Sequence, residues 1–144
     1  MRGNIITLDT NILVYSIDRD AGERHHKAVD LVDRAVDHEC ILTLQSLGEF
    51  FVAATRKGKM SFEEVSAQIR DWQLLFPIIS SQPSSLDKAV SAVQKHHLPF
   101  WDALIWAVAQ ESGVTIFFSE DFQNGRTLGT VRFCNPFLVK DPFG

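Results

Sequence analysis

The sequence predicts an α/β fold, a three-layer α/β/α sandwich around a mainly parallel sheet. Short apolar runs alternate along the chain with longer segments in which apolar residues recur at helical spacing. The chain also shows no linker, internal repeat or low-complexity segment. We therefore expect residues 1–144 to form one domain.

Two strand–helix units open the chain. Residues 4–8 form a short apolar run that ends at Asp9, and a short helix is expected from Asn11 onward. A longer helix is predicted over residues 21–39. Its core-facing stripe follows the i, i+3, i+4, i+7 pattern and consists of Ala28, Leu31, Val32, Ala35 and Val36.

The middle of the chain predicts a strand at residues 40–44, two helices and a short strand at 77–79. Ser46 and Glu49 have capping-box spacing at the start of the first helix, which Gly58 ends. Ser61 and Glu64 repeat that spacing at the start of the second. The inward side chains are expected to be Leu47, Phe50, Phe51 and Ala54, then Val65, Ile69, Trp72 and Phe76.

The last third predicts two helices and two strands. The first helix spans residues 84–97, and the second begins after Pro99 and ends at Gly113. Strands are expected at 114–118 and 130–134. The core-facing residues of the helices are expected to be Leu86, Ala89, Val90 and Val93, then Leu104, Ile105, Val108 and Ala109.

Composition is typical of a globular protein, with 45% hydrophobic and 22% charged residues. Cys40 and Cys134 lie in apolar strand-like runs, which favours buried free thiols and a reducing compartment. No signal peptide and no apolar run of about 20 residues is present, so a cytoplasmic location without membrane contact is expected.

The net charge is −4 and the isoelectric point is near 5.7. This balance argues against strong non-specific binding of nucleic acid through a basic surface. A polyanionic substrate would need bound cations and small basic sites such as residues 56–59 and Arg126.

Four acidic residues are the candidate catalytic and metal-binding residues. Asp9 and Asp121 each follow an apolar strand, and Glu49 and Asp102 are expected in the first turns of helices. In a parallel sheet the functional crevice lies beyond the carboxyl ends of the strands, where all four can converge. An oxygen-only ligand set suits Mg²⁺ or Mn²⁺, and the usual task of such a site is phosphodiester hydrolysis.

The same residues carry a resemblance to the PIN-domain family, and within it to VapC-type toxins of toxin–antitoxin pairs. The matching motifs span nearly the whole chain: residues 8–15 (LDTNILVY), 46–51 (SLGEFF), 101–105 (WDALI) and 119–122 (SEDF), with Asn124 and Gly125 following. The resemblance implies a metal-dependent endoribonuclease that cleaves RNA, a cognate small antitoxin and a homodimer. It also implies that Asp9, Glu49, Asp102 and Asp121 line the metal site, with Asn11 and Ser119 as supporting polar residues.

Each candidate residue has a structural alternative. Glu49 could complete the helix cap that begins at Ser46, and Asp102 could complement a helix dipole. Glu120 could replace Asp121, although adjacent residues point different ways and the family pattern selects Asp121. The histidine pairs 25–26 and 96–97 are interpreted as surface, and Trp72, Trp101 and Trp106 as core rather than base-stacking platforms.

Other functions remain open at this point. The alternative is a non-catalytic PIN-fold module that binds RNA or protein, but four acidic residues make a poor RNA-binding surface. A receiver-type signalling domain would need a Lys after a late strand, and the segment directly after Phe118 contains none. A haloacid-dehalogenase phosphatase would need a second Asp where Asn11 stands, and no phosphate-binding loop occurs.

Overall fold

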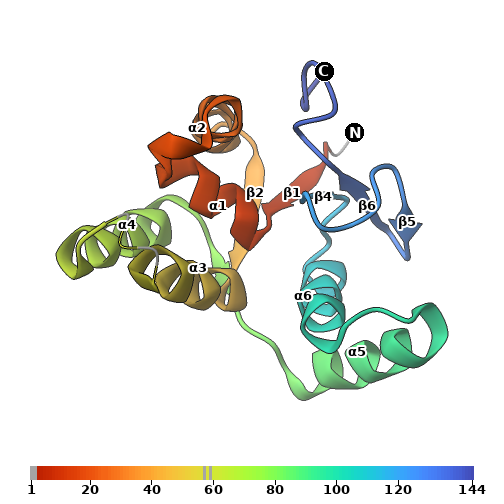
Figure 1. The fold of residues 1–144 in the computed structure, drawn as a ribbon. Helices are drawn as coiled ribbons and strands as arrows, with labels where there is room; N and C mark the ends of the chain where they lie inside the picture. Colours follow the sequence, from red (N-terminus) through yellow and green to blue (C-terminus); the bar gives the residue numbers. More distant parts are fainter. Residues whose placement is uncertain (1–2, 57, 59) are drawn as a thin grey trace.

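A mostly parallel sheet forms the centre of the molecule (Figure 1). The computed structural model describes residues 3–56, 58 and 60–144. Within these ranges the strand order is β3-β2-β1-β4-β6-β5, and all neighbours are parallel except β5 with β6. The strands are β1 (Ile5–Leu8), β2 (Glu39–Thr43), β3 (Ile78–Ile79), β4 (Ile116–Phe118), β5 (Thr127–Leu128) and β6 (Val131–Cys134). The predicted fold class is confirmed, while β5 was not predicted.

Helices cover both faces of this sheet (Figure 1). One face carries α1 (Thr10–Ile17), α2 (Glu23–Ala35), α3 (Leu44–Arg56) and α4 (Phe62–Leu75), and a 3₁₀ helix, η1 (Arg19–Ala21), joins α1 to α2. The other face carries α5 (Pro83–His96) and α6 (Phe100–Glu111). Alternation along the strands supplies both layers: Leu8 and Phe118 pack toward α1–α4, and Phe117 and Phe133 toward α5 and α6.

The start of α3 differs from the sequence prediction. The helix follows β2 directly, because the hydroxyl of Thr43 accepts a hydrogen bond from the Ser46 N–H (3.1 Å) and donates one to Ser46 Oγ (3.0 Å). Thr43 therefore caps the helix, and the predicted capping box of Ser46 and Glu49 is wrong. Glu49 lies in the second turn rather than the first. The box of Ser61 and Glu64 on α4 is confirmed.

Two predicted core stripes were too wide. Val36 follows the last residue of α2 and is 45% exposed, while Leu86 and Val90 on α5 are 48% and 56% exposed. On α5 Ala89 is buried as predicted, and Ala92, which was not predicted to face the core, is buried with it. Because these alanines are small, α5 packs closely on α6 through them, and Leu86 and Val90 remain at the surface.

Both cysteine predictions are confirmed, because Cys40 and Cys134 are buried free thiols. Burial raises the pKa of Cys40 to about 12. Among the described residues, no helix combines the length and apolar character needed to cross a membrane.

Candidate active site

The site lies where β1 and β4 end side by side. From β1 the chain runs outward to β2 and β3, then crosses back to β4 on the other side of β1, so the switch in strand order falls between β1 and β4. Ligands of open α/β sheets bind at this kind of position. Leu8 and Phe118 are register partners, and the Asp9 N–H donates to the Phe118 carbonyl (2.9 Å). Asp9 and Ser119 are thereby placed next to each other.

Asp9 forms the buried centre of the site, with 6% of its surface exposed. It caps α1 through Oδ1, which accepts from the Thr10 N–H (2.8 Å), and Oδ2 accepts from the Ser119 hydroxyl (2.6 Å). Burial raises the pKa of Asp9 to about 7, against the opposing effect of these two hydrogen bonds. The nearby charges of Asp121 and Asp102 raise it further.

Asp102 occupies the first turn of α6, as predicted. Its pKa is raised by partial burial, then by the charges of Asp121 and Glu49. Each of the four acidic residues thus interacts electrostatically with at least one other. The structure therefore brings Asp9, Glu49, Asp102 and Asp121 to one edge of the sheet, although Glu49 and Asp121 are exposed at its rim.

Two polar residues that we did not single out hold Glu49 in this group. Thr10 Oγ1 donates to Glu49 Oε1 (2.8 Å), and Gln45 Nε2 donates to Glu49 Oε2 (3.2 Å). The Gln45 amide also donates to the carbonyl of Trp101 (3.0 Å), which links α3 to the start of α6. The i, i+4 spacing of Gln45 and Glu49 could have indicated the second contact, whereas no sequence signal indicates the first.

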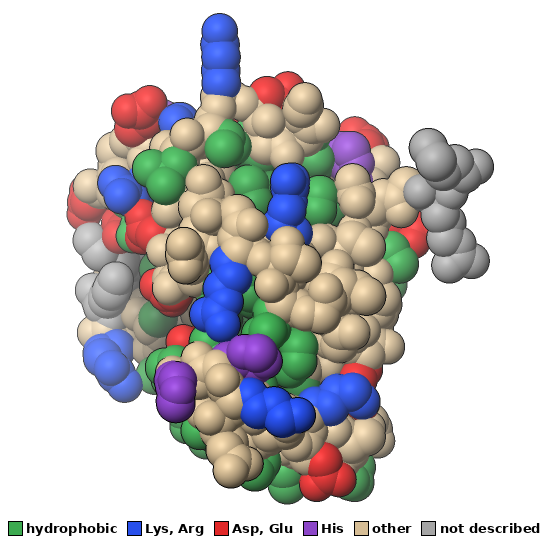
Figure 2. All heavy atoms as spheres, turned by 90° about the vertical axis from the view of Figure 1, so that its right-hand side faces the viewer, with side chains coloured by type: hydrophobic (Ala, Val, Ile, Leu, Met, Phe, Trp, Pro, Cys, Tyr) green, Lys and Arg blue, Asp and Glu red, His purple; other side chains and the backbone are tan. Residues whose placement is uncertain are grey.

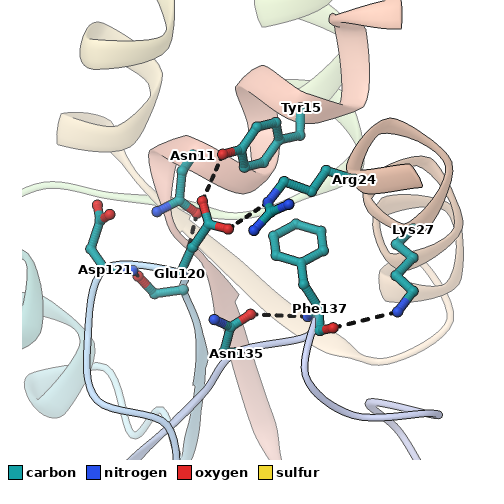
Figure 3. Close-up of polar contacts among 9 residues, drawn as sticks. Asn11, Tyr15, Arg24, Lys27, Glu120, Asp121, Asn135 and Phe137 are labelled. Atoms are coloured by element: carbon teal, nitrogen blue, oxygen red, sulfur yellow. Dashed lines mark hydrogen bonds and ion pairs between the residues drawn. The ribbon is translucent and has the colours of Figure 1, made fainter. Parts of the chain in front are cut away.

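Asp121 and Glu120 have separate environments (Figure 3). The Glu120 carboxylate accepts from the Tyr15 hydroxyl (2.6 Å) and from Arg24 Nε (2.6 Å), whereas Asp121 lies apart from both partners. Desolvation raises the pKa of Glu120, but the bonds from Tyr15 and Arg24 outweigh it, and the net shift is downward. Glu120 is therefore committed to a surface ion pair, which favours Asp121 as the acidic residue of the site.

The supporting residues both contact this segment. The Ser119 hydroxyl accepts from the Asp121 N–H (3.0 Å) while it donates to Asp9. Asn11 Oδ1 accepts a long bond from the Glu120 N–H (3.5 Å). Within the described residues, Asn11 Nδ2 and Gln45 Oε1 are buried without a hydrogen-bond partner, and both belong to this site. Buried orphaned polar atoms mark a place where water, an ion or a ligand completes the hydrogen bonding.

The donor set fits a hard divalent cation in its chemistry. It consists of carboxylate oxygens. Burial is the main cause of the raised pKa values of Asp9 and Asp102, and the charges of neighbouring acidic residues raise them further. A dication would offset that repulsion. Among the described residues, however, no three His, Cys, Asp or Glu side chains lie close enough together to hold one ion.

Comparisons with known proteins point in one direction. A family model described as the PIN domain matches residues 6–126. Among solved structures, a toxin–antitoxin complex from Klebsiella pneumoniae superposes with a TM-score of 0.68 at 21% identity, covering 93% of this chain and 99% of that one. VapC20 of Mycobacterium tuberculosis, a toxin that cleaves the sarcin–ricin loop, gives 0.61 at 17% identity over 81% and 91%. FitAcB from Neisseria gonorrhoeae gives 0.62 at 16% identity over 94% and 100%. No curated protein matches the sequence.

Proposed function

Because this chain belongs to the PIN domain family, we propose that it is a Mg²⁺- or Mn²⁺-dependent endoribonuclease and the toxin of a toxin–antitoxin pair. One observation carries the proposal. The buried Asp9 carboxylate, with its pKa near 7, is coupled to Asp102 and Asp121 at the switch point of the sheet. Such clustering is costly in an unliganded protein and suits a cation site.

The roles of the residues follow from their contacts. Asp9, Glu49, Asp102 and Asp121 would hold the ion, which would activate water and stabilise the charge on the phosphodiester oxygens. Ser119 orients Asp9 through Oδ2, and Thr10 with Gln45 orients Glu49. Asn11 supports the backbone just before Asp121.

RNA binding to an acidic protein needs local positive charge, and Lys and Arg side chains on one face of this chain can supply it. Figure 2 shows Lys and Arg side chains spread down the face formed by α5, β5 and β6. These elements carry Lys88, Lys95 and Arg132, although Lys88 also pairs with Glu111 (3.0 Å). Lys57 and Lys59, named above as basic sites, lie outside the described residues.

The partners proposed are RNA, a small antitoxin and a second copy of the chain. The Klebsiella structure is a toxin–antitoxin complex, which supports an antitoxin here. A non-catalytic PIN module remains the competing function, because it needs the same fold but no cation. The receiver-domain alternative is set aside by the family match.

The test is cleavage of single-stranded RNA by the purified protein. We expect activity with Mg²⁺ or Mn²⁺ and none in excess EDTA. Asp9→Asn and Asp102→Asn should each lower the rate at least 100-fold, because an amide keeps the shape and removes the charge that holds the cation. Asp71→Asn is the matched control, since Asp71 is an exposed acidic residue on α4.

Binding of the ion is measured separately by the rise in melting temperature on addition of Mn²⁺. The rise should appear in wild type and be lost in the Asp9→Asn/Asp102→Asn double variant. Undiminished cleavage in EDTA would refute metal dependence. Absence of both cleavage and Mn²⁺ stabilisation would favour the non-catalytic alternative.

A further inference from the structure

Trp101 is exposed beside the carboxylates. We expected this side chain in the core with Trp72 and Trp106, which are indeed buried, but 62% of its surface is accessible. It directly precedes Asp102 and packs edge-on against Phe100, with ring centroids 4.9 Å apart. A tryptophan with most of its ring accessible offers a flat aromatic face to a ligand.

The backbone that carries Trp101 is tied to the site. Gln45 Nε2 donates both to the Trp101 carbonyl and to Glu49 Oε2, so one amide links the tryptophan to an acidic residue of the cluster. Asp102, the next residue, is electrostatically coupled to Asp121 and Glu49. These contacts hold the Trp101 backbone next to Glu49 and Asp102.

A hollow of about 280 Å³ adjoins this side chain, lined by Leu44, Gln45, Ile79, Trp101 and Leu104, among others. Leu44 is 52% exposed at its edge. The volume is below the roughly 300–1,000 Å³ of sites for drug-sized ligands. It therefore suits one flat ring system better than a helix of a protein partner.

We propose that Trp101 stacks on an unpaired base of the RNA, which places the neighbouring phosphodiester at the carboxylates. The ligand is a single-stranded segment, because a base paired in a duplex has no free face for the indole. Stacking tolerates any base, since every base has a π-face. This inference rests on the proposed function, and it adds the residue that positions the substrate.

The test uses the Asp9→Asn protein, so that the RNA is not cut during titration. A single-stranded oligoadenylate should quench tryptophan fluorescence, and the signal reports on Trp101 because Trp72 and Trp106 are only 3% and 8% exposed. An abasic oligonucleotide of equal length keeps the phosphates but has no rings, and it should leave the fluorescence unchanged.

Affinity is then compared among variants by fluorescence anisotropy of labelled oligoadenylate. Trp101→Ala should bind about 5- to 150-fold more weakly, as expected for one stacked base. Trp101→Phe should retain most of the affinity because it keeps an aromatic face. Phe62→Ala is the matched control, because Phe62 on α4 is equally exposed at 63%; its affinity should equal that of the parent.

Three outcomes overturn the proposal. If Trp101→Ala binds RNA as tightly as the parent, no base binds in this hollow. If Trp101→Ala changes the oligomeric state in light scattering without losing RNA affinity, the tryptophan belongs to a protein interface. If oligoadenylate quenches the fluorescence of Asp9→Asn but the wild-type protein does not cleave RNA, the proposed nuclease activity is refuted and the base-binding site is retained. Cleavage with unchanged KM in Trp101→Ala would refute the stacking alone.

Discussion

Asp9 has two opposing effects on the folded protein. Its carboxylate caps α1 and accepts the Ser119 hydroxyl, which stabilises the fold. Its burial beside Asp102 and Asp121 opposes ionisation and raises the pKa from 3.8 to about 7. The native protein therefore holds a proton on Asp9 at pH values where the unfolded chain has lost it.

This difference predicts a pH-dependent stability. Between about pH 4 and pH 7 the native state binds more protons at Asp9 than the unfolded state, so the free energy of unfolding falls as pH rises and levels off above 7. Asp9→Asn keeps the helix cap and cannot ionise. In EDTA it should therefore be more stable than wild type at pH 8, by at most about 4 kcal/mol.

The measurement is urea unfolding of both proteins from pH 4 to pH 8 in EDTA. The advantage of Asp9→Asn should shrink toward pH 4, and the other titrating groups cancel in the difference. A gap that is constant with pH would show that Asp9 has an ordinary pKa. Mn²⁺ should reverse the order at pH 8, because the ion stabilises only the wild-type site.

At the scale of elements, the segment that carries Asp121 is fastened to α1 and α2 through Glu120 (Figure 3). Tyr15 comes from α1 and Arg24 from α2, and the Arg24 guanidinium also lies 5.4 Å from the Phe137 ring of the C-terminal segment. Tyr15 packs edge-on against the same ring at 5.4 Å. Helices α1 and α2, the segment that carries Glu120 and Asp121, and the C-terminal segment therefore meet next to the carboxylates.

A double-mutant cycle of Tyr15→Phe and Glu120→Gln tests this connection. The phenol-to-carboxylate bond should give a coupling free energy of about 1–2 kcal/mol, as for hydrogen bonds to charged groups. Phe keeps the ring that packs on Phe137, so the cycle isolates the hydroxyl. Urea unfolding supplies the four free energies.

The control cycle pairs Tyr15→Phe with Glu63→Gln, an exposed residue at the start of α4. Its two effects should add. Additivity in the Glu120 cycle as well would mean that the bond contributes nothing to holding the Asp121 segment.

Large apolar side chains remain at the surface of several helices. The most exposed on α4 is Leu74, at 85%, and Leu86 and Val90 on α5 are also open. Leu86 and Val90 are four positions apart on α5 and so share one face of that helix. Exposed apolar groups that adjoin one another favour association. They add physical support to the homodimer that the family resemblance implies.

Light scattering should give about twice the chain mass of 16.2 kDa at micromolar concentration. The hydrophobic origin of the contact predicts that the dimer persists at high salt, which would screen an association through charges. A mass of one chain across the micromolar range would contradict the dimer without affecting the ribonuclease proposal.

Much of the architecture could be read directly from the sequence. Apolar periodicity is a local property, and it located the parallel strands, the helices and the position of Asp9 at the end of β1. It failed where packing decides: Leu86 and Val90 fit a helical stripe but lie outside, because Ala89 and Ala92 make the contact with α6. The prediction that Trp101 lies in the core was also wrong, because the side chain is exposed.

The contacts within the site were decided by tertiary structure. Asp9 bonds to a residue 110 positions away, and Thr10 to one 39 positions away, so no local pattern records either pair. The choice between Glu120 and Asp121 likewise rests on Tyr15 and Arg24, about a hundred residues earlier in the chain. Strand ends are set by local hydrophobicity, so the order of amino acids alone specifies which chemistry reaches the sheet edge. Which side chains are paired, buried or exposed there depends on how distant segments pack, and only the folded chain brings those segments together.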